Sequence, residues 1–194
     1  MTTAREQILD TTCELLELQG YHATGLNQII KESGSPKGSL YYYFPGGKEE
    51  LTAEALTRVG QVVQQRMRHY LAAVDAPAES VRQFIINIAH NVEASGYRAG
   101  GPITTVAMET ASSSERLRLE CQRIYASWQA EFASKLVSGG YPEAAASHLA
   151  AVIIAAIEGG IILCRSSRSP QPLLIVADAM AALIEHSSIG ARTP

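Results

Sequence analysis

A run of residues near the N-terminus has the chemistry needed to bind an anionic partner. From Ser33 to Lys48 the chain reads SGSPKGSLYYYFPGGK, without a single aspartate or glutamate. Its lysines offer positive charge, its hydroxyls can donate hydrogen bonds, and a glycine lets a partner approach the backbone closely. Such groups contact phosphates and base edges in nucleic acids. The candidate contact residues are Lys37, Gly38, Ser39, Tyr41, Tyr42, Tyr43 and Lys48, together with Thr24, whose hydroxyl precedes a short helix.

Two short helices joined by a tight turn would position these residues. The apolar spacing predicts helices over residues 26–33 and 37–43, with the turn at Gly34 and Ser35. We expect Pro36 at the first position of the second helix, where its missing N–H costs nothing. This pattern is typical of a helix-turn-helix, whose second helix enters the major groove of DNA. The side chains expected to hold the two helices together are Ile29, Ile30, Leu40 and Phe44.

The rest of the chain also has a helical pattern, which predicts an all-α fold of about nine helices. Thr3 and Glu6 fit a capping box at the start of the first helix, and Gly20 is expected to end that helix. We expect a helix-turn-helix domain at 1–50, a helical ligand-binding and dimerisation bundle at 51–188, and a flexible tail at 189–194. The predicted helices span about 3–19, 26–33, 37–43, 48–74, 77–95, 102–110, 113–138, 142–165 and 171–187.

The overall charge does not favour a nucleic-acid partner. The chain carries 16 lysines and arginines against 19 aspartates and glutamates, a net charge of −3. Residues 1–58 alone hold five basic and eight acidic residues, which again gives −3. DNA contacts must therefore come from a small local patch. The acidic balance leaves open a helical protein-interaction module without DNA binding. An enzyme is a further alternative, but we find no catalytic motif.

Cysteine usage and hydropathy indicate a cytoplasmic protein without metal, cofactor or membrane partner. Cys13, Cys121 and Cys164 lie far apart in apolar helical stretches, so we expect buried thiols, with a redox-sensing thiol as the alternative. The most apolar stretch, residues 149–164, contains Glu158 and falls short of the ~20 residues of a membrane span. The polar N-terminal segment does not resemble a signal peptide.

The order of these features resembles the N-terminal signature of the TetR family of transcriptional repressors over roughly residues 5–56. The resemblance is carried by Gly20-Tyr21, Thr24, Ile29-Ile30, Gly34, KGSLYYYF at 37–44 and KEEL at 48–51. The segment SPKGSLYYYFPGGKEEL resembles sequences of the branch of lincomycin-resistance and flavonoid-responsive repressors. The later segment GGPITTVAMETA resembles them less directly. Two departures are Tyr43, where many members carry histidine, and Gly46-Gly47, where a charged linker is commoner.

The resemblance implies a role for each candidate residue. Lys37, Gly38 and Tyr41 occupy positions that often touch bases. The positions that often touch phosphate or sugar are those of Thr24, Ser39, Tyr42, Tyr43 and Lys48. The implied partner is a roughly palindromic double-stranded operator, bound by a homodimer and released by a small, mostly apolar or aromatic effector. An activator, or a repressor that needs a co-repressor, stays open.

The second half of the chain would supply the effector site and the dimer interface. Apolar side chains at helical spacing are the candidates for the effector site: Met67, Phe84, Ile88, Val92, Val106, Tyr125 and Trp128, with Asn87, His90, Glu109 or Glu158 as polar partners. Ordinary core packing is the alternative for each of them. The last two helices are rich in alanine and glycine, which suits close contact with a second copy. The dimerisation candidates are Val152, Ala156, Gly160, Leu174, Ala177 and Ala181.

Overall fold

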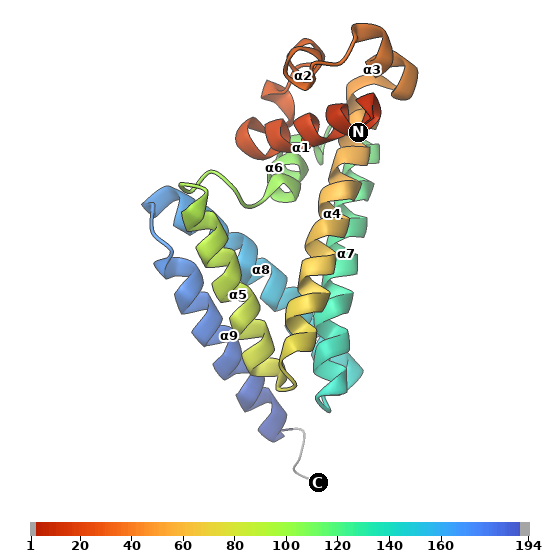
Figure 1. Ribbon diagram of the computed structural model, residues 1–194. Helices are drawn as coiled ribbons and strands as arrows, with labels where there is room; N and C mark the ends of the chain where they lie inside the picture. The colour runs from red at the N-terminus through yellow and green to blue at the C-terminus, as the bar shows by residue number, and fades with distance from the viewer. Residues whose placement is uncertain (1–2, 191–194) are drawn as a thin grey trace. The chain divides into compact units, whose positions relative to one another are not determined.

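The computed structural model describes residues 3–190, and it describes side chains through residue 187. These residues form nine α-helices, as predicted (Figure 1). The helices are α1 (Ala4–Ala23), α2 (Leu26–Ser33), α3 (Lys37–Tyr43), α4 (Gly47–Ala73), α5 (Pro77–Ala94), α6 (Pro102–Thr110), α7 (Glu115–Ser138), α8 (Glu143–Ser167) and α9 (Gln171–Gly190). Residues 189 and 190 of the predicted tail thus belong to α9, and 191–194 lie outside the described residues.

The helices divide into two compact units. Among the described residues, the first contains 3–62 and Gly101–Ile124, and the second contains Val63–Gly100 and 125–190. The unit around the helix-turn-helix is therefore larger than the predicted domain at 1–50. It takes in the first turns of α4, all of α6 and the first part of α7, because α6 packs against α1 and contributes buried apolar side chains.

The first unit is built on α1, against which both α2 and α3 pack. The predicted capping box is confirmed: the Thr3 hydroxyl accepts from the Glu6 amide at 3.3 Å, and the Thr3 amide donates to the Glu6 carboxylate at 2.8 Å. The backbone leaves the helical conformation at Gly20, where φ is 78°, and a last turn follows to Ala23. Gly34 ends α2 with φ of 64°, a left-handed conformation that favours glycine.

One detail of the turn differs from the prediction. Pro36 is the residue that precedes the first turn of α3 rather than its first helical residue, with φ −59° and ψ 140°. The residue before a helix adopts extended backbone while its carbonyl already accepts a helical bond. The Pro36 carbonyl does so, since it accepts from the Ser39 amide at 2.9 Å.

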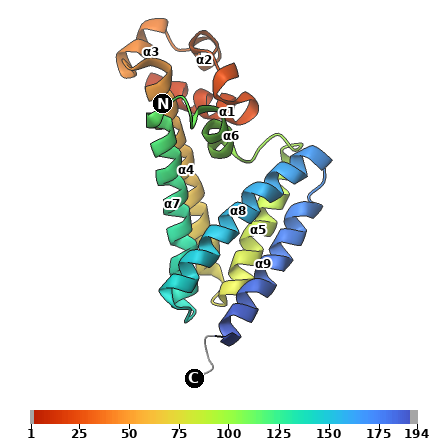
Figure 2. The same cartoon turned by 180° about the vertical axis from the view of Figure 1, so that it is seen from behind.

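The second unit is a helical bundle in which α5, α8 and α9 pack together, as both views of the ribbon show (Figures 1 and 2). By length and composition, α8 is apolar enough to cross a membrane. Yet Ala150, Ile153 and Ile157 of α8 are buried inside the unit. An apolar core helix of a soluble protein passes the same test, and burial accounts for part of the apolar character of α8, with 44% of its apolar window buried.

The three thiols are held in the protein interior or close to it. Cys121 and Cys164 are buried, and Cys13 is half-buried with its thiol 3.5 Å from the Ala55 carbonyl. Burial raises the pKa of both Cys13 and Cys121 to about 11. These two thiols are therefore protonated near neutral pH, which favours the structural interpretation over a redox-sensing thiol.

Candidate DNA-binding site

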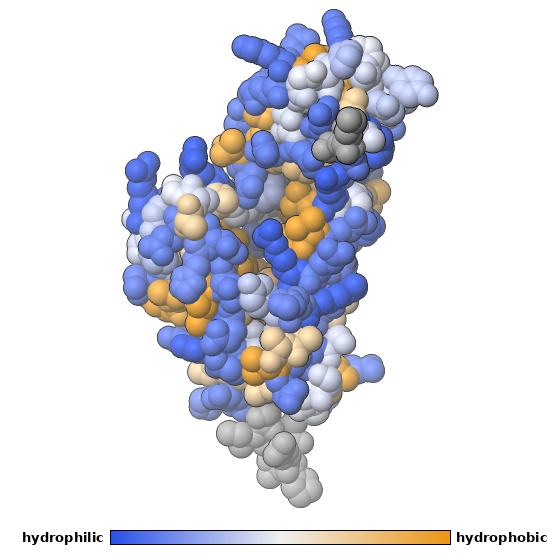
Figure 3. Space-filling model, in the orientation of Figure 1, coloured by the Kyte–Doolittle hydropathy of each residue, from blue (hydrophilic) through white to orange (hydrophobic). Residues whose placement is uncertain are grey.

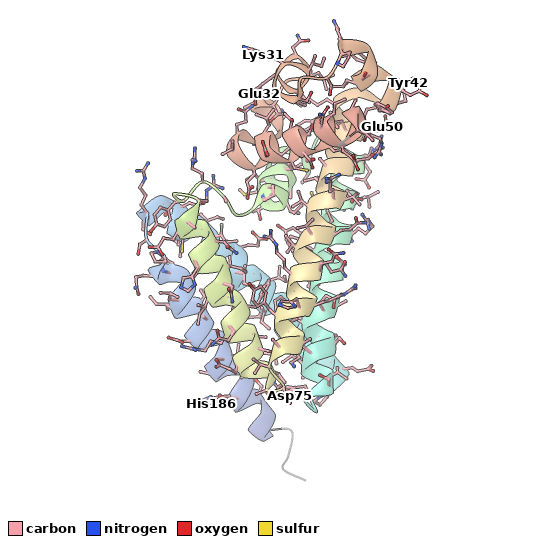
Figure 4. All side chains as sticks on the ribbon, viewed as in Figure 1. Lys31, Glu32, Tyr42, Glu50, Asp75 and His186 are labelled. Atoms are coloured by element: carbon pink, nitrogen blue, oxygen red, sulfur yellow. The ribbon has the colours of Figure 1, made fainter. Side chains whose placement is uncertain are left out.

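Helix α3 presents most of the predicted contact residues on its surface. Lys37, Gly38, Tyr41, Tyr42 and Tyr43 are exposed, and Ser39 is half-buried. Tyr42 is 80% exposed, and in Figure 4 it points outward from the end of α3. The surface over α2 and α3 is mostly blue to white in Figure 3, as a water-exposed face should be. The candidates of this helix are thus accessible at the surface, although the three consecutive tyrosines point in different directions around the helix axis.

Buried side chains on the opposite side hold α3 in place. Leu40 and Phe44 are fully buried and Ile29 nearly so, as predicted, while Ile30 is only half-buried. The Arg5 guanidinium of α1 lies 5.5 Å from the centre of the Phe44 ring, a cation–π contact. Because a seven-residue helix cannot stand alone in water, this packing on α1 is what fixes the direction of the exposed tyrosines.

Lys48 lies in the first turn of α4 and is half-buried. Its ammonium group is 4.2 Å from the centre of the Tyr21 ring. Burial lowers the pKa of Lys48, while the negative charge of Glu109 acts in the opposite direction. Lys48 is thus held against Tyr21 of α1, next to the helix-turn-helix.

Thr24 is placed differently from the other candidates. Its side chain is only 1% exposed, and its hydroxyl donates to the Gly20 carbonyl at 2.6 Å. The hydroxyl therefore closes the last turn of α1 instead of facing outward. In this conformation Thr24 supports the junction between α1 and α2, and it offers no donor at the surface.

Glu49 and Glu50 at the start of α4 were not among the candidate site residues, although they belong to the KEEL motif. The Gly46 amide donates to the Glu50 carboxylate at 2.7 Å, which closes the turn after α3. The other oxygen of Glu50 lies 4.0 Å from the Arg116 guanidinium of α7, and Glu49 accepts from the Ser114 hydroxyl. Acidic side chains in a first helical turn also match the helix dipole. The turn after α3 is thereby tied to α7.

The candidates for the effector site are divided between the units. Val106 and Glu109 lie on α6 in the first unit, and Glu109 accepts a hydrogen bond from the His22 amide. The other apolar candidates belong to the second unit: Met67, Phe84, Val92 and Trp128 are buried, and Ile88 and Tyr125 are half-buried. The pairing of Tyr125 with Trp128 places their rings 5.5 Å apart, edge to face.

Sequence reasoning missed two aromatic residues in the second unit. The ring of Phe84 lies 6.1 Å from that of Tyr70 and 5.8 Å from that of Phe132. Tyr70 follows Met67 by three residues on α4, and Phe132 follows Trp128 by four on α7. Each therefore lies on the same helix face as a chosen residue, and this spacing was the signal that could have found it.

The dimerisation candidates also fall into two groups. Gly160 and Ala177 are buried within the chain, and a Cβ at Gly160 would lie 2.7 Å from Leu173 of α9. Val152 is exposed, and Ala156, Leu174 and Ala181 are half-buried. Large apolar side chains that the sequence reading did not choose are exposed on the same two helices, and Figure 3 shows hydrophobic surface over α9. They are Ile162, Leu163, Ile175 and Leu183.

Both halves of the chain match known families. Residues 8–55 match the model described as bacterial regulatory proteins, tetR family. Residues 77–179 match the model described as transcriptional regulator LmrA/YxaF-like, C-terminal domain. The two matches together cover the helix-turn-helix and most of α5 to α9.

Two bacterial proteins are similar over nearly the whole length. The chain is 44% identical over 181 residues to YxaF of Bacillus subtilis (strain 168), described as an uncharacterized HTH-type transcriptional regulator, which covers 93% of this chain and 95% of that protein. It is 39% identical over 183 residues to the HTH-type transcriptional regulator LmrA of the same organism, covering 94% and 97%. The fold is similar to the crystal structure of regulatory protein TetR from Rhodobacter sphaeroides, with a TM-score of 0.83 at 19% identity, covering 92% and 97%.

Proposed function

This chain belongs to the TetR family of bacterial transcriptional regulators, in its LmrA/YxaF-like branch, and on that basis we propose that it is a repressor that binds a roughly palindromic operator as a homodimer. Members of the family bind DNA through the helix-turn-helix and effectors through the C-terminal domain, and they are regulators rather than enzymes. We propose three points beyond the family membership: that the protein represses transcription, that it binds its operator as a dimer, and what kind of effector it takes. We place the protein in the cytoplasm.

The observation that carries the proposal is the exposed, acid-free face of α3. Lys37 and Gly38 begin this helix, and the tyrosines follow at its end. A lysine near the N-terminus of a recognition helix reaches base edges or phosphates in the major groove. The tyrosine hydroxyls donate to phosphate oxygens, and their rings pack on thymine methyl groups. The local surface therefore attracts DNA although the whole chain carries a charge of −3.

The C-terminal half would receive a small, mostly apolar or aromatic effector. Its support is the set of aromatic side chains in the second unit, in which the Phe84 ring lies edge to face with Phe132 and tilted against Tyr70. The effector would shift the population towards a state in which the two DNA-binding domains of the dimer no longer match the spacing of the half-sites. It does so only if its affinity differs between the two states. Helix α4, which contributes residues to both units, would carry the change.

A mobility-shift titration tests the proposal. The purified full chain is titrated against the intergenic DNA upstream of its own gene, with excess non-specific competitor, beside three variants. Lys37→Ala and Tyr41→Ala should each weaken operator binding about tenfold or more, because each removes one contact to a base. Arg66→Ala is the matched control, since it removes an exposed positive charge from α4 outside the candidate face and should leave the affinity unchanged.

The outcomes separate the proposal from its alternative. Competitor-resistant binding that both α3 variants lose supports the operator-binding function. Equal binding by the wild type and both variants would contradict the role of α3. If no shift is seen at micromolar protein, selection from random double-stranded DNA decides, and failure to enrich any sequence there favours a helical interaction module.

A further inference from the structure

The last turn of α1 is shaped around a side chain of α6. At Gly20 the backbone has φ 78° and ψ −174°, so the helix is interrupted three residues before its end. A Cβ at this position would collide with the Glu109 carboxylate and lie 3.0 Å from Thr105 Cγ2. Its positive φ thus requires glycine at position 20, and any larger residue there would also displace the Glu109 side chain.

Glu109 holds this interrupted turn through two contacts with one residue. Its carboxylate accepts from the His22 amide at 2.7 Å, and its backbone carbonyl lies 3.2 Å from the His22 ring nitrogen Nε2. An amide beside a break in a helix has lost its regular acceptor and needs another one. A carboxylate is a strong acceptor for a backbone amide, because the hydrogen bond is charge-assisted.

The same carboxylate acts on the beginning of α4. Glu109 favours the charged form of Lys48, whose ammonium group lies over the ring of Tyr21, the residue before His22. Glu109 therefore contacts the turn that leads into α2, and its charge also favours the charged form of Lys48 in the helix that follows α3. All of these residues belong to the first unit.

We infer that Glu109 is a positioning residue for DNA binding, whose carboxylate fixes the turn at residues 20–24 and thereby the placement of α2 and α3. The inference rests on the proposed operator binding, since it concerns how the reading helix is held. Helix α6 would then support DNA binding indirectly, through the Glu109 side chain that reaches this turn. A glutamate spans the gap to the His22 amide, whereas aspartate is one methylene shorter and cannot reach it without movement of the backbone.

A series of substitutions at position 109 separates reach from charge. Glu109→Gln keeps the length and a carbonyl acceptor, so operator affinity should stay within about threefold of wild type. Glu109→Asp keeps the charge but loses the reach, and Glu109→Ala loses both, so each should weaken operator binding about tenfold. His22→Ala keeps the backbone amide and loses only the ring contact to the Glu109 carbonyl, so it should weaken operator binding less than Glu109→Ala does. Glu115→Gln, at an exposed pair with Arg118 on α7, is the matched control.

The measurement is fluorescence anisotropy with operator and with scrambled DNA, below the melting temperature of every variant. A displaced reading helix lowers the affinity for operator but leaves the affinity for scrambled DNA within about twofold, because the latter depends on charge alone. A general loss of stability would not change that ratio. Wild-type operator affinity in Glu109→Ala, or tighter binding by Glu109→Asp than by Glu109→Gln, would overturn the inference. If Lys37→Ala also binds operator normally, the proposed function fails instead.

Discussion

At Gly38 the needs of folding and of DNA binding oppose each other. A Cβ added there would meet nothing within 4 Å, so nothing in the free protein requires glycine at this position of α3. Glycine inside a helix nevertheless costs stability, because it loses more backbone freedom on folding than alanine does. A DNA groove that approaches the backbone at this point would give the glycine a reason.

Gly38→Ala should therefore raise stability and lower operator affinity. The expected gain in the free energy of unfolding is about 0.5–1 kcal/mol, measured by urea denaturation. Operator affinity should fall about tenfold, because the new methyl group lies where the DNA approaches. Gly159→Ala gives a matched control for stability, since Gly159 is also helical with open space around its Cβ position. Unchanged operator affinity in Gly38→Ala would show that this face does not meet DNA closely.

Single residues also mark the limit of reading a function from the sequence. Lys37 and the three tyrosines could be chosen because their residue types, together with an acid-free neighbourhood, indicate an exposed face. Thr24 was chosen for its hydroxyl, but that hydroxyl is turned inward to the Gly20 carbonyl. Glu109 was one of four candidate polar partners for the effector, but it contacts His22, 87 positions away along the chain. No local pattern reveals which amide a carboxylate meets at such a separation.

At the scale of elements, glycines and acidic residues decide how helices meet. The nine helices could be predicted to within a few residues, because capping, proline and glycine signals act locally. The extent of the first unit could not be predicted. It depends on contacts of α6 and α7 with α1 and α4, which lie 40 or more residues earlier in the chain. Gly60 of α4 belongs to this contact: a Cβ there would lie 3.0 Å from Ile124 of α7.

Gly60→Val should destabilise the protein by overfilling the contact between α4 and α7. We expect a loss of about 1–3 kcal/mol in the free energy of unfolding, measured by urea denaturation. The neighbouring Gln61→Val is the control, because residue 61 is exposed and the same valine there should change stability by no more than about 0.5 kcal/mol. Equal losses in the two variants would mean that valine weakens α4 through its helix propensity and not through Ile124.

At the scale of the whole molecule, α8 and α9 expose more apolar side chains than a lone chain in water would keep. Ile175 is 66% exposed, Leu163 57% and Ile162 52%. Such a surface is covered by a partner in many soluble proteins. A second copy meeting these helices about a two-fold axis would bury them and present two copies of α3 to one palindromic operator.

Val152→Glu should therefore convert dimer to monomer at micromolar concentration, as measured by sedimentation equilibrium. It should also weaken operator binding about tenfold or more, because two half-sites are then no longer engaged by one linked pair. Val137→Glu is the matched control, with the same substitution at a similarly exposed valine on α7. A monomeric wild type, or an unchanged dimer in Val152→Glu, would contradict an interface at this part of α8.

The central claim is that the local face of α3, and not the overall charge, binds the operator. The most direct test measures operator and scrambled-DNA affinity for the wild type and Lys37→Ala across a range of salt concentrations. We predict that the wild type prefers the operator by about 10³ or more and loses affinity steeply as salt rises. Lys37→Ala should lower that preference about tenfold or more. Equal affinity of the wild type for both DNAs, or an unchanged preference in Lys37→Ala, would contradict the account.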